Sequence, residues 1–566
     1  KSKLQQQEQQ KKTTKQTIRI IFPSRSMTEN KKEALEAAIA AMTKSSPRSL
    51  FDVTIICTTD DFQAEFWMKR LSEGLCASSS DEGKFPMVLA VSEDWASSGA
   101  GNGLGTLYAY QKAAALAEEK HGIKLSELLK AKEVSAALYH TAGKGTRLAP
   151  LPASENNNKP GVKLPCCHKL SDGSLAPITV LEAVVKQTGV YAATRKGRLS
   201  VFWGDQVFIP SAPFTSAPTH HVDIMCTLLG ETAPTAEEWK EKGLDKYGVI
   251  AVAKGEERNA AQVEKVDHAT ALKMLESLGD IGQVGPSLGS FSVSAEILDA
   301  LCEEFKEELT AKTAKMDTDP HFWMPLTLPK ADYITLMETK DTPKEESEPH
   351  HERMTKMKEG FKLGDMGLFG AVDVGSEAAW WDYGQLKLYT INNVKLMEDD
   401  YDAQLLRKFL EVEDRKTGSA LDGVTVDDAS CVFASTIKAG SIQNSVLASV
   451  KSLDIKADGA IIVNCTARKI EAGKGAILYN MVTDSEEGLV AKEGEVMVTV
   501  TNEEGEMILL KSNQAVDGKK SWSKVLEGNT HSFEGMHFLN SDSNVSEIEE
   551  ERTKIFAKTA ETLGLA

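Results

Sequence analysis

The first two thirds of the chain alternate short apolar runs with longer amphipathic stretches. Apolar runs bounded by turn residues are typical of buried strands, and amphipathic runs of ten or more residues are typical of helices. The predicted strands cover residues 18–22, 51–57, 87–91, 136–140 and 199–203, and the predicted helices cover 31–42, 64–74, 104–121 and 177–189. Because strands alternate with helices, the pattern predicts an α/β fold whose mixed, mostly parallel sheet carries helices on both faces.

The pattern changes to short steps after about Asp427. Segments 437–440, 455–458 and 470–473 each begin with isoleucine, continue into small or polar residues, and recur at offsets of eighteen and fifteen. Such repeats are typical of a parallel β-helix, where each coil stacks its aliphatic residue on the coil below. We expect a short left-handed parallel β-helix, with a sandwich of short strands as the alternative. Residues 545–563 are predicted to form an amphipathic, charged helix.

These patterns divide the chain into consecutive parts. We expect a disordered polar tail at 1–17, an α/β domain at 18–400, a linker at 401–426, the β-helix at 427–515 and a C-terminal segment with its helix at 516–566. Within the α/β domain, residues 341–360 are crowded with Lys, Glu and His and lack periodicity, which predicts a solvated loop. Its His350-His351 pair fits a surface position better than a metal site, because no carboxylate or cysteine spacing supports a ligand set.

Composition narrows the classes of protein. With 41% hydrophobic residues and no apolar run near the ~18 residues of a membrane span, the chain is predicted to be soluble, without a membrane partner. A net charge of −18 argues against nucleic-acid binding, which needs clustered cations. Eight scattered cysteines without a CxxC pair fit neither a disulfide framework nor a zinc site. We expect a cytoplasmic protein; because the chain begins at Lys1, an organelle stroma after loss of a targeting peptide is the alternative.

The strongest chemical signal is the loop that follows the predicted strand 136–140. Its residues, 141–148, include two glycines whose backbone N–H groups can approach phosphate oxygens, and Lys144 and Arg147 can neutralise charge on those oxygens. The glycines lack the spacing and the terminal Gly-Lys-Ser/Thr of a P-loop, so a different kind of phosphate site is predicted. The candidate nucleotide-binding residues here are Ala142, Gly143, Lys144, Gly145 and Thr146.

This loop carries a family resemblance. Residues 143–148, followed by Asn-Lys-Pro at 158–160, resemble the G-x-G-T-R-L and P-K-P signature of sugar nucleotidylyltransferases. The resemblance implies that the loop holds a nucleoside triphosphate, that Arg147 is the catalytic cation and that Lys159 is its catalytic partner. Lys163 is a fallback substrate-binding residue, because the sequence around it departs from the usual short P-K-P-L-L-P form.

Two aspartates are the candidate metal ligands. Asp205 ends a predicted apolar strand, where an open α/β sheet presents ligand-binding groups, and it resembles the family's strand-end metal aspartate. Asp382 lies in residues 380–385, which resemble the family's W-x-D-x-G-T motif with Gln in place of the final Thr. Asp373 is its rival, but a tryptophan precedes Asp382 by two, as the motif requires. The resemblance implies that Asp205 and Asp382 hold Mg²⁺.

The sugar site is expected between these aspartates along the chain. Tyr247-Gly248 and the later pair Glu264-Lys265 resemble the family's Y-G-V and E-K segments. In the family, the Glu and Lys contact the sugar and its phosphate. The resemblance therefore implies that Tyr247, Gly248, Glu264 and Lys265 bind substrate.

A second glycine loop precedes the first. Gly101, Asn102, Gly103 and Thr106 follow a predicted strand and open a helix, but no strand-end acidic residue follows as a dinucleotide site requires, so NAD is not expected. The loop resembles the G-N-G-x-x-T-L-x-A segment of fucose-1-phosphate guanylyltransferases, and the resemblance extends over about residues 51–482. It implies that this loop also binds nucleotide, although the G-T-R-L form of the later loop departs from that family.

The expected activity is the condensation of a nucleoside triphosphate with a sugar 1-phosphate to give a nucleotide sugar and pyrophosphate. The substrate pairs considered are GTP with fucose 1-phosphate and UTP or GTP with a hexose 1-phosphate. A regulatory nucleotide-sugar-binding protein on the same fold is the alternative. An acyltransferase carried by the β-helix is disfavoured, because no histidine lies between Cys431 and Asn529 to act as general base. A homo-oligomer would form through the β-helix or the terminal helix.

Overall fold

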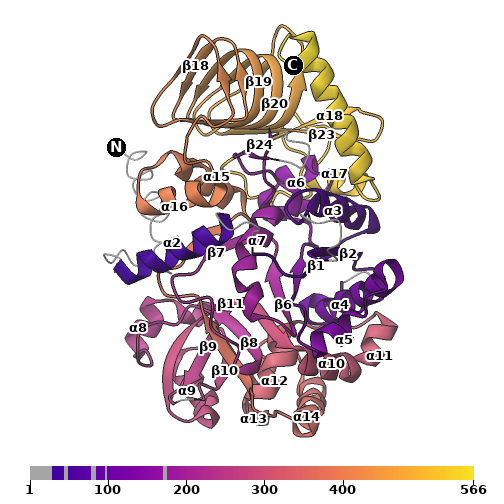
Figure 1. Cartoon of the computed structure of the whole chain (residues 1–566), viewed down its shortest axis with the longest axis vertical. Coiled ribbons are helices and arrows are strands. Elements are labelled where there is room, and N and C mark those ends of the chain that lie inside the picture. Colours follow the sequence, from indigo (N-terminus) through magenta and orange to yellow (C-terminus); the bar gives the residue numbers. More distant parts are fainter. Residues whose placement is uncertain (1–28, 44–48, 78–84, 96–98, 170–174, 256) are drawn as a thin grey trace.

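The computed structural model describes residues 29–43, 49–77, 85–95, 99–169, 175–255 and 257–566. The predicted polar tail 1–17 and the predicted strand 18–22 lie outside the described residues. Figure 1 shows an α/β body with a stack of strands at one end, and helix α18 (Val545–Thr562) lies beside that stack and extends toward the body. Within the described part of the chain, no helix is long and apolar enough to cross a membrane.

The α/β body is built on a mixed sheet with a parallel core. The strands β2 (Met87–Ser92), β1 (Val53–Thr58), β3 (Ala136–His140) and β6 (Arg198–Trp203) lie side by side in that order, all parallel. Beyond β6 lies the antiparallel β11 (Ile281–Ser294), where the sheet branches. One part of β11 pairs with β8 (His220–Cys226), which pairs with β12 (Gly367–Asp373), and the other part pairs with β9 (Gly248–Ala253), which pairs with β10 (Ala260–Glu264). The predicted strands that fall within the described residues are confirmed, with ends shifted by at most two positions.

Alternate residues of these strands enter two separate cores, because successive side chains of a strand point to opposite faces. In β3, Ala136 and Leu138 pack into the core that contains the apolar face of α4 (Gly101–His121), whereas Ala137 and Tyr139 pack into the core that contains α7 (Val180–Thr188). Full burial of a Leu or Val side chain stabilises the fold by about 1.5–3 kcal/mol. The prediction of an α/β fold with helices on both faces is confirmed.

The predicted helices within the described residues are confirmed, and shorter ones lie between them. The α-helices are α2 (Glu29–Thr43), α3 (Asp61–Glu73), α4, α5 (Leu125–Lys130), α6 (Leu151–Ser154), α7, α8 (Ala236–Glu241), α9 (His268–Met274), α10 (Ala295–Glu304), α11 (Lys306–Ala311), α12 (Met324–Thr327), α13 (Lys330–Glu338), α14 (Lys344–Gly360), α15 (Leu386–Val394), α16 (Tyr401–Leu410), α17 (Phe533–Leu539) and α18. The segment 401–426, which we expected to be a linker, includes α16, whose Leu405, Leu406 and Phe409 are buried.

The prediction of a solvated loop at 341–360 is wrong, because α14 occupies this segment. Its buried residues Ser347, His351 and Met354 follow one another at helical spacing, so a short inward face exists despite the many charges. His351 Nε2 hydrogen-bonds the backbone oxygen of Leu328 at 2.9 Å, and His350 Nε2 hydrogen-bonds that of His321 at 2.7 Å. The two histidines therefore tie α14 to the body.

The C-terminal region is rich in strands that stack in parallel. β19 (Val446–Asp458), β20 (Ile461–Ala472), β21 (Ile477–Thr483) and β23 (Glu495–Thr501) pair in that order, and β24 (Met507–Asn513) closes the series in antiparallel orientation. Ile455 of β19 lies beside Ile470 of β20, as the repeat predicts. The predicted offset of eighteen is wrong, because Ile437 pairs with Ser452 instead of Ile455. The register between β17 and β19 is fifteen residues, so Ile437 does not lie in the row that contains Ile455 and Ile470.

The remaining strands are short. They are β4 (His168–Lys169), β5 (Leu175–Ala176), β7 (Gln206–Ile209), β13 (Ala379–Asp382), β14 (Ala420–Leu421), β15 (Val424–Val426), β16 (Cys431–Phe433), β17 (Thr436–Ile437), β18 (Gly440–Gln443) and β22 (Leu489–Ala491). Among them, β7 and β13 form a separate two-stranded antiparallel ladder. This ladder positions two of the predicted site residues.

Candidate active site

The loop after β3 is open to solvent. Ala142, Gly143, Lys144 and Arg147 are all exposed, and Gly143 has a φ of 135°, which disfavours any residue with a side chain. None of the described atoms outside its chain neighbours lies within 4 Å of a methyl group placed on Gly143. Backbone N–H groups of this loop are therefore accessible to an anionic ligand.

Gly145 lets a lysine pass close to this loop. A methyl group on Gly145 would lie 3.2 Å from Cγ of Lys159 and 3.0 Å from Cγ of Pro152. Its φ of 62° also favours glycine. The aliphatic stem of Lys159 thus runs along the loop, and its Nζ forms an ion pair with Oδ2 of Asp205 at 2.6 Å. The sequence-predicted Lys159 and Asp205 are brought together.

Asp382 reaches the same place through the β7–β13 ladder. Asp382 pairs with Gln206, the neighbour of Asp205, and the N–H of Tyr383 donates to the backbone oxygen of Asp205 at 2.9 Å. A methyl group on Gly384 would lie 2.7 Å from Oδ2 of Asp205 and 3.1 Å from Oδ1 of Asp382. The two carboxylates therefore converge on one small glycine.

The charges around Asp382 confirm this proximity. Burial raises the pKa of the Asp382 carboxyl, and the negative charge of Asp205 adds to the rise. The N–H of Gly384, which donates to Asp382 Oδ1 at 2.7 Å, and the cations Arg147 and Lys159 act in the opposite direction on this pKa. The four charged residues predicted for the phosphate site thus share one electrostatic environment.

Asp373, the alternative metal ligand, binds backbone N–H groups with its side chain. Its Oδ1 accepts hydrogen bonds from the N–H groups of Leu228 at 3.0 Å and of Gly375 at 2.9 Å. Burial raises the pKa of Asp373, and the two backbone N–H groups oppose that rise. Asp382, in contrast, pairs with Gln206 in the β7–β13 ladder and lies with Asp205 around Gly384.

The Asp205–Asp382 pair suits a divalent cation. Carboxylate oxygens are hard ligands, and Mg²⁺ in phosphate-transfer sites is typically held by one or two carboxylates together with substrate phosphates. Within the described residues, no group of three or more His, Cys, Asp or Glu side chains could hold a metal ion by itself. The two aspartates suit a cation such as Mg²⁺ that would take its remaining ligands from outside the protein.

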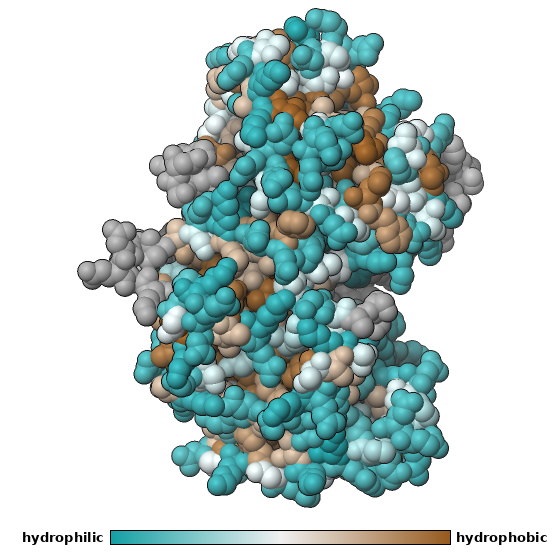
Figure 2. All heavy atoms as spheres, turned by 90° about the vertical axis from the view of Figure 1, so that its right-hand side faces the viewer, coloured by the Kyte–Doolittle hydropathy of each residue, from teal (hydrophilic) through white to brown (hydrophobic). Residues whose placement is uncertain are grey.

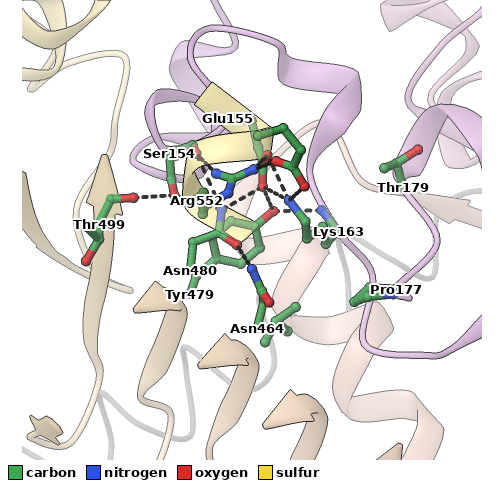
Figure 3. Close-up of polar contacts among 12 residues, drawn as sticks. Ser154, Glu155, Lys163, Pro177, Thr179, Asn464, Tyr479, Asn480, Thr499 and Arg552 are labelled. Atoms are coloured by element: carbon green, nitrogen blue, oxygen red, sulfur yellow. Dashed lines mark hydrogen bonds and ion pairs between the residues drawn. The ribbon is translucent and has the colours of Figure 1, made fainter. Parts of the chain in front are cut away.

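Lys163 lies away from this group, in a buried cluster drawn in Figure 3. Its Nζ donates to both carboxylate oxygens of Glu155, at 2.8 Å and 2.9 Å, and its side chain is 7% exposed. The structure therefore does not support Lys163 as the alternative to Lys159 for contacting phosphate. Its ammonium group is already bound by the buried carboxylate of Glu155.

The glycine loop at the start of α4 is filled by the protein itself. The N–H of Gly103 donates to the backbone oxygen of Met316 at 2.9 Å, and the N–H of Asn102 donates to Oδ1 of Asp317 at 3.0 Å. A methyl group on Gly101 would lie 2.5 Å from the Met316 oxygen, and one on Gly103 would lie 2.8 Å from the same oxygen. The close approach of residues 316–317 therefore explains these two glycines, and their N–H groups are not an open phosphate cradle.

Thr106, further along α4, connects this loop to the end of β3. Its Oγ1 lies 2.8 Å from Nε2 of His140, the residue directly before the open loop. Burial lowers the pKa of His140 to about 4, so its ring is neutral at physiological pH. His140 also lies near the Trp203 ring, with centroids 5.5 Å apart. The second glycine loop thus supports the strand that carries the first.

The predicted sugar-binding residues lie together at the adjacent ends of β9 and β10. Glu264 pairs with Gly248, and the N–H of Lys265 donates to the backbone oxygen of Tyr247 at 2.9 Å. Tyr247 is exposed. Burial alone would raise the pKa of Glu264, but Lys265 and Lys340 bind its carboxylate and lower the pKa.

Sequence reasoning missed two polar residues beside this group. A methyl group on Gly248 would lie 3.4 Å from Nε2 of Gln262 and 3.8 Å from Oδ2 of Asp319. Burial, with the added charge of Glu264, raises the pKa of Asp319 to about 6. No spacing pattern connects Asp319 with β9 or β10, because Asp319 begins a short π-helix, Asp319–Trp323, far away in sequence. Gln262 could have been found as an inward-facing polar residue of a predicted strand.

Comparison with known proteins finds no family model and no curated protein that matches this chain. The site itself combines an open glycine loop with two cations and two converging carboxylates. Backbone N–H groups and cations suit phosphate oxygens, and paired carboxylates suit the cation that accompanies a polyphosphate. The arrangement can therefore bind and polarise a nucleoside triphosphate.

Proposed function

We propose that this chain is a sugar-1-phosphate nucleotidylyltransferase, which forms a nucleotide sugar and pyrophosphate. The observation that carries the proposal is the 2.6 Å ion pair between Lys159 and Asp205, with Asp382 directly across Gly384. These three residues are far apart in sequence and were each selected by the resemblance to sugar nucleotidylyltransferases. Their convergence beside Arg147 supports that resemblance.

In the proposed reaction, a phosphate oxygen of the sugar 1-phosphate attacks the α-phosphorus of the triphosphate in line with the departing pyrophosphate. The new P–O bond forms as the bond between the α- and β-phosphates breaks, so no covalent enzyme intermediate is required. Arg147 and Lys159 neutralise the charge that develops on the phosphate oxygens. Asp205 and Asp382 would hold Mg²⁺, which draws charge from the phosphate oxygens when bound.

The sugar phosphate would bind toward the ends of β9 and β10. Lys265 is exposed and can contact the sugar phosphate, while Glu264 can accept hydrogen bonds from sugar hydroxyls. The substrate pairs proposed are GTP with fucose 1-phosphate and UTP or GTP with a hexose 1-phosphate. Pocket shape, which short motifs do not record, decides among these pairs.

We also infer the finer fold. The parallel β2-β1-β3-β6 core with helices on both sides supports a Rossmann-like nucleotidyltransferase domain. In the C-terminal region, parallel pairing of β19, β20 and β21 at a register of fifteen or sixteen residues supports a left-handed parallel β-helix over a sandwich of short strands.

A substrate screen tests the proposed function. Purified protein with Mg²⁺, each common nucleoside triphosphate and a panel of sugar 1-phosphates is assayed for pyrophosphate release. At least one pair should be turned over, and chelation of Mg²⁺ should abolish the release. Tight binding of nucleotide sugars without any pyrophosphate release would instead identify a regulatory binding protein.

A further inference from the structure

The five residues directly before Lys159, Ser154–Asn158, are held by side-chain hydrogen bonds to distant parts of the chain. We call these residues the anchor segment. Its side-chain hydrogen bonds outside Glu155 include those from Ser154 Oγ to the Thr499 oxygen (2.6 Å), from Asn156 Nδ2 to the Thr501 oxygen (2.9 Å), from Asn157 Nδ2 to the His537 oxygen (2.7 Å), from Trp67 Nε1 to Asn158 Oδ1 (3.0 Å) and from Asn480 Nδ2 to Ser154 Oγ (3.0 Å). Most of these partners belong to the C-terminal region.

Glu155, the second residue of the anchor segment, is the centre of a buried charged cluster. Its carboxylate accepts hydrogen bonds from Lys163, from Asn480 Nδ2 at 2.8 Å, from Arg552 Nη2 at 3.0 Å and from the hydroxyl of Tyr479. Arg552, on α18, also donates to the backbone oxygen of Ser154 at 2.7 Å. Figure 3 shows these groups converging from α18, from the stacked strands and from the α/β body.

The main effect of the charged cluster is to fix the position of the anchor segment, because its net contribution to the free energy of unfolding is small. The side chains of Glu155 and Arg552 are only 6% and 4% exposed, so their desolvation offsets most of their mutual attraction. A buried ion pair held by several hydrogen bonds, here from Arg552 Nη1 and Nη2, nevertheless admits few alternative arrangements. It therefore fixes where the anchor segment lies relative to α18 and β21.

The chain after Lys159 is fixed as well. A short 3-10 turn at Lys159–Gly161 leads to Lys163, whose N–H donates to the Tyr479 hydroxyl at 2.8 Å and whose backbone oxygen accepts from the Tyr389 hydroxyl at 2.9 Å. Lys159 thus projects toward Asp205 from a backbone that is held on both sides. The C-terminal region supplies contacts on each side.

From these contacts we infer that Arg552 is a positioning residue for the reaction: acting through Glu155, it holds the anchor segment and thereby places the ammonium group of Lys159 at the phosphate site. The inference rests on the proposed function for the role of Lys159. The C-terminal helix is then part of the catalytic apparatus without touching substrate, and an enzyme lacking it would bind nucleotide with a misplaced cation.

A double-mutant cycle tests this inference. Arg552→Met should lower kcat by about 10²-fold, the loss typical of a misplacement of roughly 1 Å in a catalytic group. In a Lys159→Met background, the same substitution should cause less than a tenth of that loss, because the group that it positions is already absent. Arg552→Lys, which keeps the charge, should recover part of the activity. Lys558→Met, at an exposed position of α18, is the matched control and should leave kcat unchanged.

Equal losses in the two backgrounds would overturn the inference, because a general loss of folded protein would act on both alike. If Arg552→Met fails to fold, Asn157→Gly replaces it in the cycle. Glycine accepts the φ of 66° at this position, and the substitution removes the side-chain hydrogen bond to the His537 oxygen. About a tenfold loss of kcat is expected when Lys159 is present, and much less in the Lys159→Met variant.

A second measurement does not depend on activity. Amide hydrogen exchange of residues 153–163, followed by mass spectrometry, should be at least tenfold faster in Arg552→Met than in Lys558→Met. If the wild-type protein releases no pyrophosphate with any substrate pair, the proposed function fails while this measurement still tests the anchoring. Unchanged exchange in Arg552→Met would contradict the anchoring itself.

Discussion

The two glycine loops of this protein look alike in sequence and differ in what approaches them. At the start of α4, the Met316 oxygen lies only 2.5 Å and 2.8 Å from where methyl groups on Gly101 and Gly103 would be, and residues 316–317 accept the N–H groups of that helix end. After β3, Gly143 faces open space and its neighbours are exposed. The glycines at the start of α4 therefore mark a close approach of the protein itself, whereas Gly143 leaves the backbone open to a ligand.

This difference assigns the two loops separate tasks. The filled loop joins α4 to a turn more than two hundred residues away in sequence and supports His140 through Thr106. The open loop leaves Arg147 exposed beside Asp382, and it faces the Lys159–Asp205 pair. Substitutions in the open loop should change chemistry, whereas those in the filled loop should change stability.

The largest expected effect is in the open loop. Arg147→Met should lower kcat by about 10³-fold, because a cation that offsets transition-state charge contributes about 4 kcal/mol. Its melting temperature should stay within about 1 °C of wild type, since Arg147 is exposed. Arg468→Met is the control: it removes a weak surface ion pair with Glu486 and should leave kcat unchanged. A wild-type kcat for Arg147→Met would remove this loop from the reaction.

A medium effect is expected in the filled loop. Gly103→Ala places a methyl group 2.8 Å from the Met316 oxygen, and overpacking of this kind costs about 2 kcal/mol of unfolding free energy. Gly360→Ala, where none of the described atoms crowds the new methyl group, is the matched control. Urea unfolding measures the free energy of unfolding of both variants. Equal stability of both would show that residues 316–317 move aside easily and that the loop can open to a ligand.

The smallest effect concerns the charged cluster that holds the anchor segment before Lys159. Burial alone would raise the pKa of Glu155, but Lys163 and Arg552 lower it from 4.5 to about 2. Because the folded pKa is depressed, the stability from this group is present above pH 4.5 and is lost as the pH falls toward 2. The stability difference between wild type and Glu155→Gln should therefore shrink by about 1 kcal/mol between pH 7 and pH 3.5.

Thermal unfolding across this pH range, with the exposed Glu561→Gln as control, measures the change. A stability difference that is constant with pH would mean that Glu155 titrates normally. The charged cluster would then add no pH-dependent stability.

The sequence predicted the α/β body well because its central strands are largely apolar runs, which a sheet covered on both faces buries. The open loop and Asp205 were also within reach, since both follow directly from such strands. Lys163 was misjudged because spacing does not reveal that Glu155 and Arg552, the latter 389 positions later, enclose its charge. Helix α14 was missed because its inward face consists of Ser347, His351 and Met354, which do not form a continuous apolar pattern.

The central claim depends on which aspartate, Asp382 or Asp373, holds Mg²⁺ together with Asp205. The most direct measurement is Mg²⁺-dependent pyrophosphate release by wild type, Asp382→Asn and Asp373→Asn, each confirmed as folded by circular dichroism. The proposed site predicts at least a ~10³-fold loss of kcat for Asp382→Asn, because a carboxylate that holds the metal is neutralised, and activity within about tenfold of wild type for Asp373→Asn. Full activity in Asp382→Asn together with its loss in Asp373→Asn would contradict the account.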